Sequence, residues 1–126
     1  MKEILTKAAA QMIEETPAVV QAVLADLAQG EQIAAKIKFG TATDPVYVAL
    51  SAKNFYYFTK SSDQFLAEIY PVSSVRGFSV LPPRGETAGR MTVFTKNGEI
   101  KLTISSLECY AKTLVLYRAV RSFMEK

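Results

Sequence analysis

The stretch MTVFTKNGEIKLTI, residues 91–104, carries the clearest signal for the fold of this chain. Apolar and polar residues alternate on both sides of Asn97-Gly98, which is the pattern of strands that bury one face. Both central residues of a type I′ turn need a positive φ, and Asn-Gly tolerates this best. The stretch therefore predicts a tight antiparallel hairpin, in which Lys96 and Glu99 face each other as an opposite-charge pair.

The same alternation extends towards the N-terminus. Turn residues separate runs with a period of two at residues 33–39, 46–50, 55–59, 65–70, 75–81, 91–95 and 100–104. Seven antiparallel strands with turn signals about every ten residues favour a sandwich or a partly open barrel. The run Phe55-Tyr56-Tyr57-Phe58 is aromatic on both faces. One face must enter the core, which leaves the other for a protein contact or a stacking platform.

The first fifteen residues have a helical period. Leu5 and Met12 fall on the apolar face of a first predicted helix. Ile13 lies at the edge of that face and Glu14 lies opposite it. A helix of this kind has one stripe that must be buried against another element.

A second helix is predicted up to Gly30, which supplies its stop. Thr16 is expected to cap it, and Pro17 suits its first position because that N–H would be unsatisfied in any case. The apolar face of this helix is predicted to consist of Val20, Val23, Leu24 and Leu27.

The C-terminus is again helical. Ser105 and Glu108 have the spacing of a capping box. The apolar stripe that follows consists of Cys109, Leu116, Val120 and Phe123. Leu114 and Val115 lie away from this stripe, so the helix has more apolar surface than one buried face requires.

These patterns predict a mainly β chain of the α+β class. Residues 1–29 form an N-terminal helical extension of two short helices. Residues 30–126 form a seven-stranded antiparallel barrel or sandwich, partly open, with the C-terminal helix closing one end.

The order of these segments resembles the bacterial pleckstrin-homology-like (PH-like) domain family. The likeness covers about residues 30–126. It begins with Gly30-Glu31, continues in YVALSAKNFYYF (47–58) and IYPVSSV (69–75), and ends with the Asn97-Gly98 hairpin and the terminal helix. The resemblance implies a PH-like barrel without catalytic residues or cofactors. It also implies a scaffold that hosts lipid binding, peptide binding or oligomerisation.

The lipid-binding members of that wider family resemble one another in a basic first hairpin. This chain offers Lys36 and Lys38 at that place, followed by Asp44, Pro45 and Val46 instead of a second basic cluster. We therefore expect at most a weak, peripheral contact of Lys36 and Lys38 with anionic lipid.

Composition argues against several other functions. The chain of 126 residues has 15 Lys+Arg and 12 Asp+Glu, a net charge of +3, which is too mild for a specific nucleic-acid binder. It has no His and one Cys, so the commonest general base and the usual metal ligands are missing. Cys109 falls on the apolar face of its helix, where a small buried side chain is expected. We expect no enzyme, no metal and no cofactor.

The N-terminal residues do not have the pattern of a signal peptide, because charges interrupt the apolar run at Lys2, Glu3 and Lys7. No stretch approaches the roughly 20 apolar residues of a membrane-spanning helix. We therefore expect a cytoplasmic protein.

Apolar excess is the most informative functional feature. Three amphipathic helices accompany a barrel that needs one, and stripes of this kind are buried within the chain or against a partner. The sequence therefore predicts a homo-oligomer or a protein partner. The candidate contact residues are Leu5, Met12, Val20, Leu24, Leu114 and Val115. Weak peripheral lipid binding is the alternative.

Overall fold

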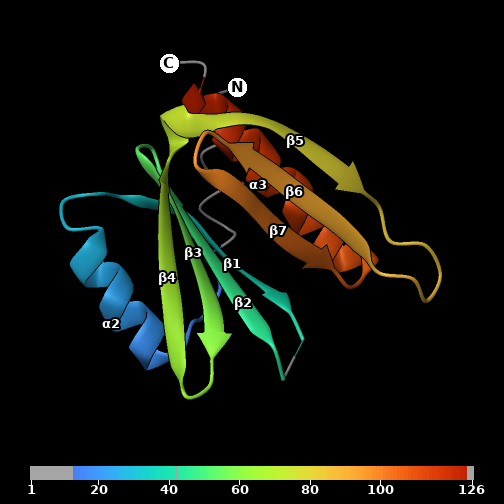
Figure 1. Ribbon diagram of the computed structural model, residues 1–126, viewed down its shortest axis with the longest axis horizontal. Helices are drawn as coiled ribbons and strands as arrows, with labels where there is room; N and C mark the ends of the chain where they lie inside the picture. Colours follow the sequence, from blue (N-terminus) through green and yellow to red (C-terminus); the bar gives the residue numbers. More distant parts are fainter. Residues whose placement is uncertain (1–12, 42, 125–126) are drawn as a thin grey trace.

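The computed structural model describes residues 13–41 and 43–124 (Figure 1). In chain order its elements are α2 (Ala18–Leu27), β1 (Ile33–Gly40), β2 (Pro45–Ser51), β3 (Asn54–Ser61), β4 (Gln64–Pro71), the 3₁₀ turn η1 (Val72–Ser74), β5 (Val75–Leu81), β6 (Gly89–Thr95), β7 (Gly98–Ile104) and α3 (Leu107–Met124). The strands form two antiparallel sheets, β1-β2-β3-β4 and β5-β6-β7. The predicted mainly β, α+β class is confirmed, and the arrangement is consistent with a PH-like fold.

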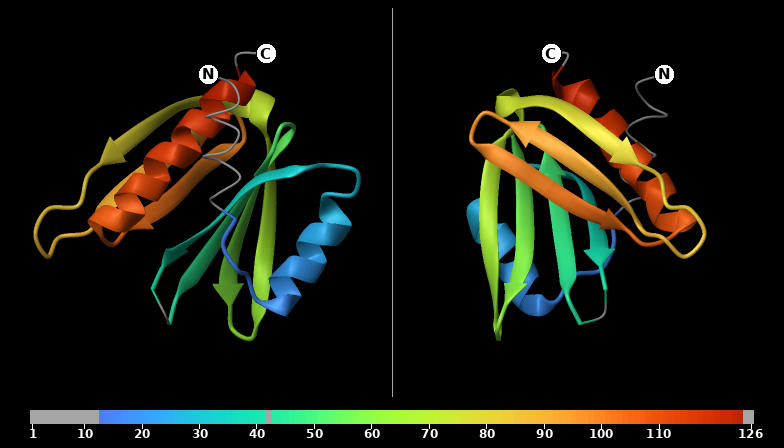
Figure 2. Two further views of the ribbon diagram at one scale, coloured as in Figure 1. Left: turned by 180° about the vertical axis from the view of Figure 1, so that it is seen from behind. Right: turned by 45° about the vertical axis from the view of Figure 1, so that its right-hand side comes forward.

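The main core lies between the two sheets and α3. Alternate residues of each strand point into it, as the period of two requires. Figure 2 shows α3 running along one face of the three-stranded sheet, and α3 also packs against β1 and η1. The fully buried side chains from the three elements include Ile37, Phe39, Leu50, Phe55, Met91, Ile100, Leu102, Ile104 and Leu116. The C-terminal helix thus closes the sandwich as predicted.

A second core covers the opposite face of the four-stranded sheet. Here α2 packs Val20 and Leu24 onto the outward-pointing side chains of β2 and β3, among them Tyr56 and Phe58. Phe55 enters the main core on the other face of β3. Both aromatic faces of β3 are therefore covered within the chain, which leaves no open stacking platform on this strand. The helix that contains residues 18–27 forms a third layer of the structure.

Residues 13–17 are not helical. Ile13 forms a parallel bridge with Lys36, and the Glu14 N–H donates to the Lys36 carbonyl at 2.9 Å. Ile13 and Glu14 therefore do not belong to a helix, contrary to the sequence prediction. The predicted residues Leu5 and Met12 lie outside the described residues.

The start of α2 also differs from the prediction. The helix begins at Ala18, and Pro17 precedes it as the capping residue. The Thr16 hydroxyl donates to the Gln21 side chain at 3.0 Å, so it does not cap a backbone N–H of the helix. At its other end α2 stops at Leu27 with Ala28 as the C-cap, so the predicted stop at Gly30 lies three residues too late. Gly30 belongs to the turn that follows, where its φ of +79° is one that other residues rarely adopt.

The hairpin between β6 and β7 forms, but its turn lies one residue earlier than predicted. Thr95 pairs with Gly98, so Lys96 and Asn97 are the central residues and Asn97 does not have a positive φ. The Thr95 hydroxyl explains the shift, since it accepts from the Asn97 N–H at 3.2 Å and donates to the Gly98 carbonyl at 2.7 Å. Glu99 consequently pairs with Phe94, and the predicted Lys96–Glu99 pair is wrong.

The cap of α3 is also displaced by one residue, here towards the C-terminus. The helix begins at Leu107, and the Ser106 hydroxyl accepts a hydrogen bond from the Cys109 N–H at 3.1 Å. Ser106 is therefore the N-cap, and the predicted capping box of Ser105 and Glu108 is wrong. Two consecutive serines at this boundary both suit a cap, so residue type alone does not select between them.

We predict that Ser106→Ala destabilises the fold by about 1 kcal/mol, because one orphan N–H of the first turn loses its partner. The matched control Ser105→Ala should change the free energy of unfolding by less than about 0.5 kcal/mol. Urea unfolding followed by circular dichroism measures both. Equal effects of the two substitutions would contradict this assignment of the cap.

Candidate functional site

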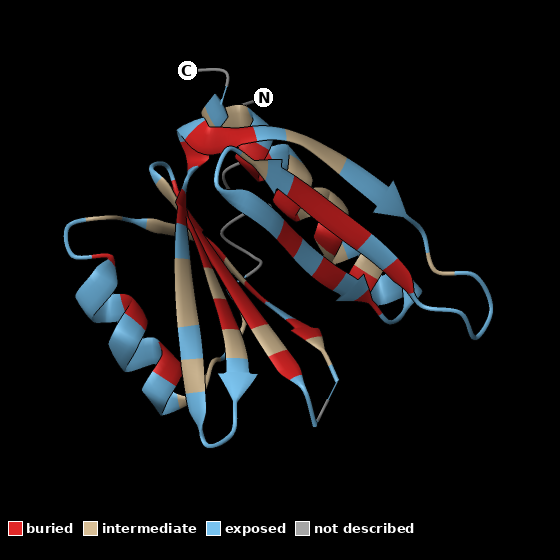
Figure 3. Ribbon diagram, viewed as in Figure 1, coloured by how far each residue is buried: buried red, intermediate tan, exposed pale blue. Residues whose placement is uncertain are grey.

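The exposed side of α2 is apolar. Gln21 and Asp26 are the only polar residues among its ten, and only Val20 and Leu24 within the helix are buried. Val19 is 53% exposed, Val23 36% and Leu27 39%. Figure 3 shows most of the helix surface as exposed. A helix that is apolar on nearly all sides is typical of a buried environment, which α2 does not have within this chain.

The exposed valines and leucine lie on the flank of α2 that faces β4. On the opposite flank, Gln21 accepts a hydrogen bond from the Lys36 ammonium of β1 at 2.7 Å, so this flank faces β1. At 100° per residue, Val19 and Val23 lie about 160° from Gln21 around the helix axis. Leu27 lies between Val23 and the buried stripe of Val20 and Leu24. On β4, Ile69 points to the same face of the sheet and is 44% exposed. We call Val19, Val23, Leu27 and Ile69 the α2–β4 surface.

This surface borders an open sheet edge. In the part of the chain that the structure describes, β4 pairs with β3 along one side and with no strand along the other. Glu68 is its one charged residue, and the Tyr70 hydroxyl donates a hydrogen bond to that carboxylate. Its eight residues pair with β3 without a register shift. The edge therefore has neither a bulge nor a basic side chain to discourage pairing with another strand.

The other sheet edges differ from that of β4. Ile13 bridges to β1, and β1 also lies against β7. On β5, the register shifts between Val75 and Gly77, and the exposed Arg76 lies at this irregularity. Phe78 of β5 packs edge-to-face on Tyr117 of α3, with ring centroids 4.8 Å apart. Each of these edges is partly covered or irregular.

The structure corrects part of the predicted contact surface. Val20 and Leu24 are 1% and 2% exposed, because both pack into the second core of their own chain. Their side chains are therefore not available to a partner. Leu114 and Val115 are half-buried on α3, apart from the α2–β4 surface. Among the candidates that lie within the described residues, the pair on α2 and the pair on α3 therefore do not form one site.

Sequence reasoning missed the α2–β4 surface although a signal was present. Val23 and Leu27 share a helical face with Val20 and Leu24, and the pattern alone assigns all four to the buried side. The scarcity of polar residues on the rest of the helix is the signal that could have identified an exposed apolar flank. Ile69 had no such signal, because its exposure depends on β4 being an edge strand.

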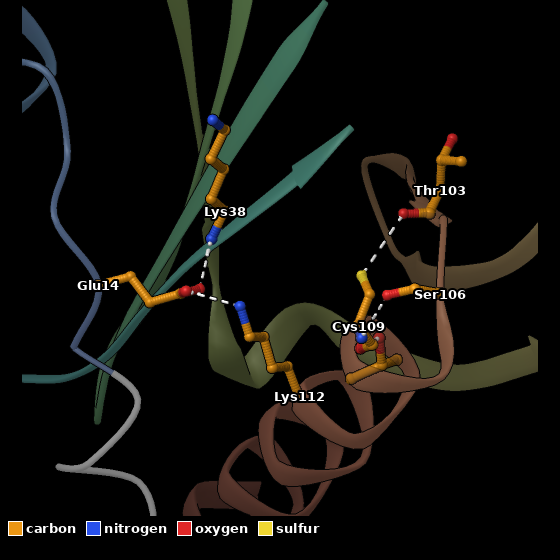
Figure 4. Close-up of polar contacts among 7 residues, drawn as sticks. Glu14, Lys38, Thr103, Ser106, Cys109 and Lys112 are labelled. Carbon is orange, nitrogen blue, oxygen red and sulfur yellow. Dashed lines mark hydrogen bonds and ion pairs between the residues drawn. The ribbon is translucent and has the colours of Figure 1, made fainter. Parts of the chain in front are cut away.

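Lys36 and Lys38 do not form a matched basic pair. Gln21 engages the Lys36 ammonium, whereas the Lys38 side chain is exposed. The Lys38 N–H donates to Glu14 at 3.1 Å, and the other Glu14 oxygen lies 2.6 Å from the Lys112 ammonium (Figure 4). The hydrogen bond to Glu14 raises the pKa of Lys112. Glu14 thus ties the segment before α2 to both β1 and α3.

A hydrogen-bonded carboxylate holds the link between α2 and β1. Glu31 accepts hydrogen bonds from the Ser51 hydroxyl, from the Tyr56 hydroxyl at 2.7 Å and from the Asn54 amide at 3.2 Å. The bonds from Ser51 and Tyr56 lower the pKa of Glu31. Burial and the bond to Glu31 raise the pKa of Tyr56 to about 12. This cluster fastens the chain after α2 to the β2–β3 turn.

Cys109 is buried in the main core, as its place on the helix predicts. Its thiol points to the Thr103 carbonyl at 3.9 Å (Figure 4). Within the described ranges, no three potential metal-ligating side chains converge. The helices among the same residues are too short or too polar to cross a lipid bilayer.

The outer face of the β5-β6-β7 sheet contains a shallow depression of about 350 Å³. Arg90 and Lys101 line it together with Glu99, which lies 3.9 Å from the Lys101 ammonium. Leu81 and Phe94 add apolar area. Because charges of both signs and apolar groups share this depression, it does not favour one class of ligand.

A scan against models of protein families finds no family that matches this chain. A search of curated proteins finds no relative either.

We predict that Glu31→Gln lowers the free energy of unfolding by about 1 kcal/mol at neutral pH, since charge-assisted hydrogen bonds are lost at a partly exposed site. The pKa of Glu31 is depressed below 4.5 in the folded state, so its contribution is present above that pH. The contribution is lost as the pH falls through the folded pKa. Urea unfolding at pH 7 and pH 3 should show the gap between wild type and variant closing at pH 3.

The matched control is Glu15→Gln, because Glu15 is exposed. It should leave stability unchanged within about 0.5 kcal/mol at both pH values. A gap for Glu31→Gln that is equally large at pH 3 and pH 7 would argue against the charge as its source.

Proposed function

We propose that this chain is a non-enzymatic protein-association module that acts through the α2–β4 surface. Membership of the bacterial PH-like family, which its sequence resembles, is part of the proposal. The observation that carries it is the apolar flank of α2 beside the unpaired edge of β4. Burying apolar surface yields about 25 cal/mol per Å², so a partner that covers both elements gains free energy from side chains and backbone alike.

The chemistry of this surface favours a protein over an anionic ligand. Neither α2 nor β4 contains a Lys or an Arg, so a lipid headgroup or a nucleic-acid phosphate would meet no countercharge from these two elements. A polypeptide can use both the apolar flank and the free N–H and C=O groups of β4. Weak lipid binding at Lys36 and Lys38 has less support, since the Lys36 ammonium is already hydrogen-bonded.

Site-specific photo-crosslinking in living cells tests this proposal. A benzophenone amino acid replaces Leu27 in one variant and Leu107 in another, and the latter leucine is 74% exposed on α3. We expect several-fold more protein adduct from position 27, despite its lower exposure. Adding Ile69→Glu should suppress that adduct, because a partner across the surface also contacts β4 and would bury this charge.

Two outcomes would overturn the proposal. One is an equal or larger yield of adduct from position 107. The other is an adduct from position 27 that Ile69→Glu does not reduce, because such a partner would not use β4.

A further inference from the structure

We infer that the partner of the α2–β4 surface is a second copy of this chain, joined by antiparallel pairing of the two β4 strands about a two-fold axis at Ala67. This inference rests on the proposed function and deepens it. It rests on two observations. The first is the set of backbone groups that β4 presents at its free edge, and the second is which residues face each other when two β4 strands pair in antiparallel orientation.

The hairpin register identifies the backbone groups at the free edge. Ser61 pairs with Gln64 across a two-residue turn, and such a turn closes on a hydrogen-bonded pair. Hydrogen-bonded and non-hydrogen-bonded pairs then alternate along an antiparallel ladder. The N–H and C=O groups of Leu66 and Glu68 therefore point to β3. Those of Phe65, Ala67 and Ile69 point away from it, to the open edge.

One self-pairing register uses all three of these residues. When Ala67 lies opposite Ala67 of the second copy, Phe65 of each chain lies opposite Ile69 of the other. All six outward-pointing residues then belong to hydrogen-bonded pairs. A two-fold axis at Leu66 or Glu68 instead places a residue at the centre whose backbone groups already bond to β3.

The side chains match in the same register. Phe65, Ala67 and Ile69 all point to the face that α2 covers, since they pair with the outer-facing residues of β3. Pairing about Ala67 forms two aromatic–aliphatic Phe65–Ile69 pairs on that face, a favourable type of cross-strand contact. On the other face, Leu66 lies opposite Glu68, so the two carboxylates are not directly opposed. In this register a second copy therefore places apolar side chains opposite each other on one face and keeps the two carboxylates apart on the other.

The resulting assembly is closed. Joining two four-stranded sheets through β4 gives one continuous eight-stranded sheet with both α2 helices on the same face. Each remaining edge of that sheet is a β1 strand, which Ile13 and β7 partly cover. An interface that uses the same patch on both copies ends at a dimer and does not propagate.

Disulfide trapping tests the register. In a Cys109→Ser background, one protein carries Leu66→Cys and another carries Glu68→Cys. Positions 66 and 68 of opposite chains form a non-hydrogen-bonded pair with Cα atoms about 4.5 Å apart, whereas identical positions are separated by about 8 Å. Mild oxidation of the mixture should therefore give at least about tenfold more linked dimer than either protein alone.

Sedimentation equilibrium tests the assembly itself. Wild-type protein at high micromolar concentration should be a dimer, and Ile69→Lys should make it a monomer because a lysine on an edge strand opposes pairing. Leu107→Lys is the control and should remain a dimer. Circular dichroism establishes that each variant is folded.

A wild-type protein that stays monomeric overturns this inference. A dimer whose mixed cysteine variants link no faster than the separate ones overturns it as well. The inference can also fail while the proposed function stands: if position 27 crosslinks only to a different protein and the chain is monomeric, the association surface remains and the second copy is excluded as its partner.

Discussion

The four-stranded sheet is apolar on both of its faces, and the rest of the structure depends on this constraint. In β2 every residue except Val46 is buried, and in β3 Phe55 points to one side while Tyr56 and Phe58 point to the other. A sheet of this kind needs a cover on each face. The three-stranded sheet with α3 supplies one, and α2 supplies the other.

The two covers are attached in different ways. The inner cover is connected directly to the four-stranded sheet, because η1 links β4 to β5. The helix α3 then completes the same core. The outer cover is a ten-residue helix connected by short links, and polar contacts at its two ends hold it. Gln21 binds Lys36 near the start of the helix, and Glu31 binds Ser51, Tyr56 and Asn54 just after its end. The helix is narrower than the sheet it covers, which leaves Ile69 of β4 exposed beside its apolar flank.

Strand positions could be predicted from the sequence because the alternation follows burial directly. The seven runs between Ile33 and Ile104 all form strands. Single-residue choices at boundaries could not be predicted. At Asn97-Gly98, the Thr95 hydroxyl moved the turn by one residue, and at Ser105-Ser106 the second serine became the cap. Each choice depends on a local hydrogen bond that residue type does not specify.

The candidate surface was harder to predict, since exposure depends on tertiary packing. Val20 and Leu24 are buried while Val23 and Leu27 are not, although all four lie on one helical face. The rotation of α2 decides between them, and that rotation reflects contacts with distant strands, namely the packing of Val20 and Leu24 on β2 and β3 and the hydrogen bond from Lys36 to Gln21. Likewise, no local pattern identifies β4 as the edge strand that leaves Ile69 exposed.

A matched pair of substitutions in α2 tests the central claim, that the outer face of the sheet needs this helix as its cover. Leu24→Ala and Leu27→Ala remove the same atoms from a buried and an exposed position, and urea unfolding of dilute protein measures the cost of each. Leu24→Ala should lower the free energy of unfolding by about 2–4 kcal/mol, and Leu27→Ala by less than about 1 kcal/mol. Equal and small effects would contradict the account, because α2 would then be an appendage on a sheet that is stable without it.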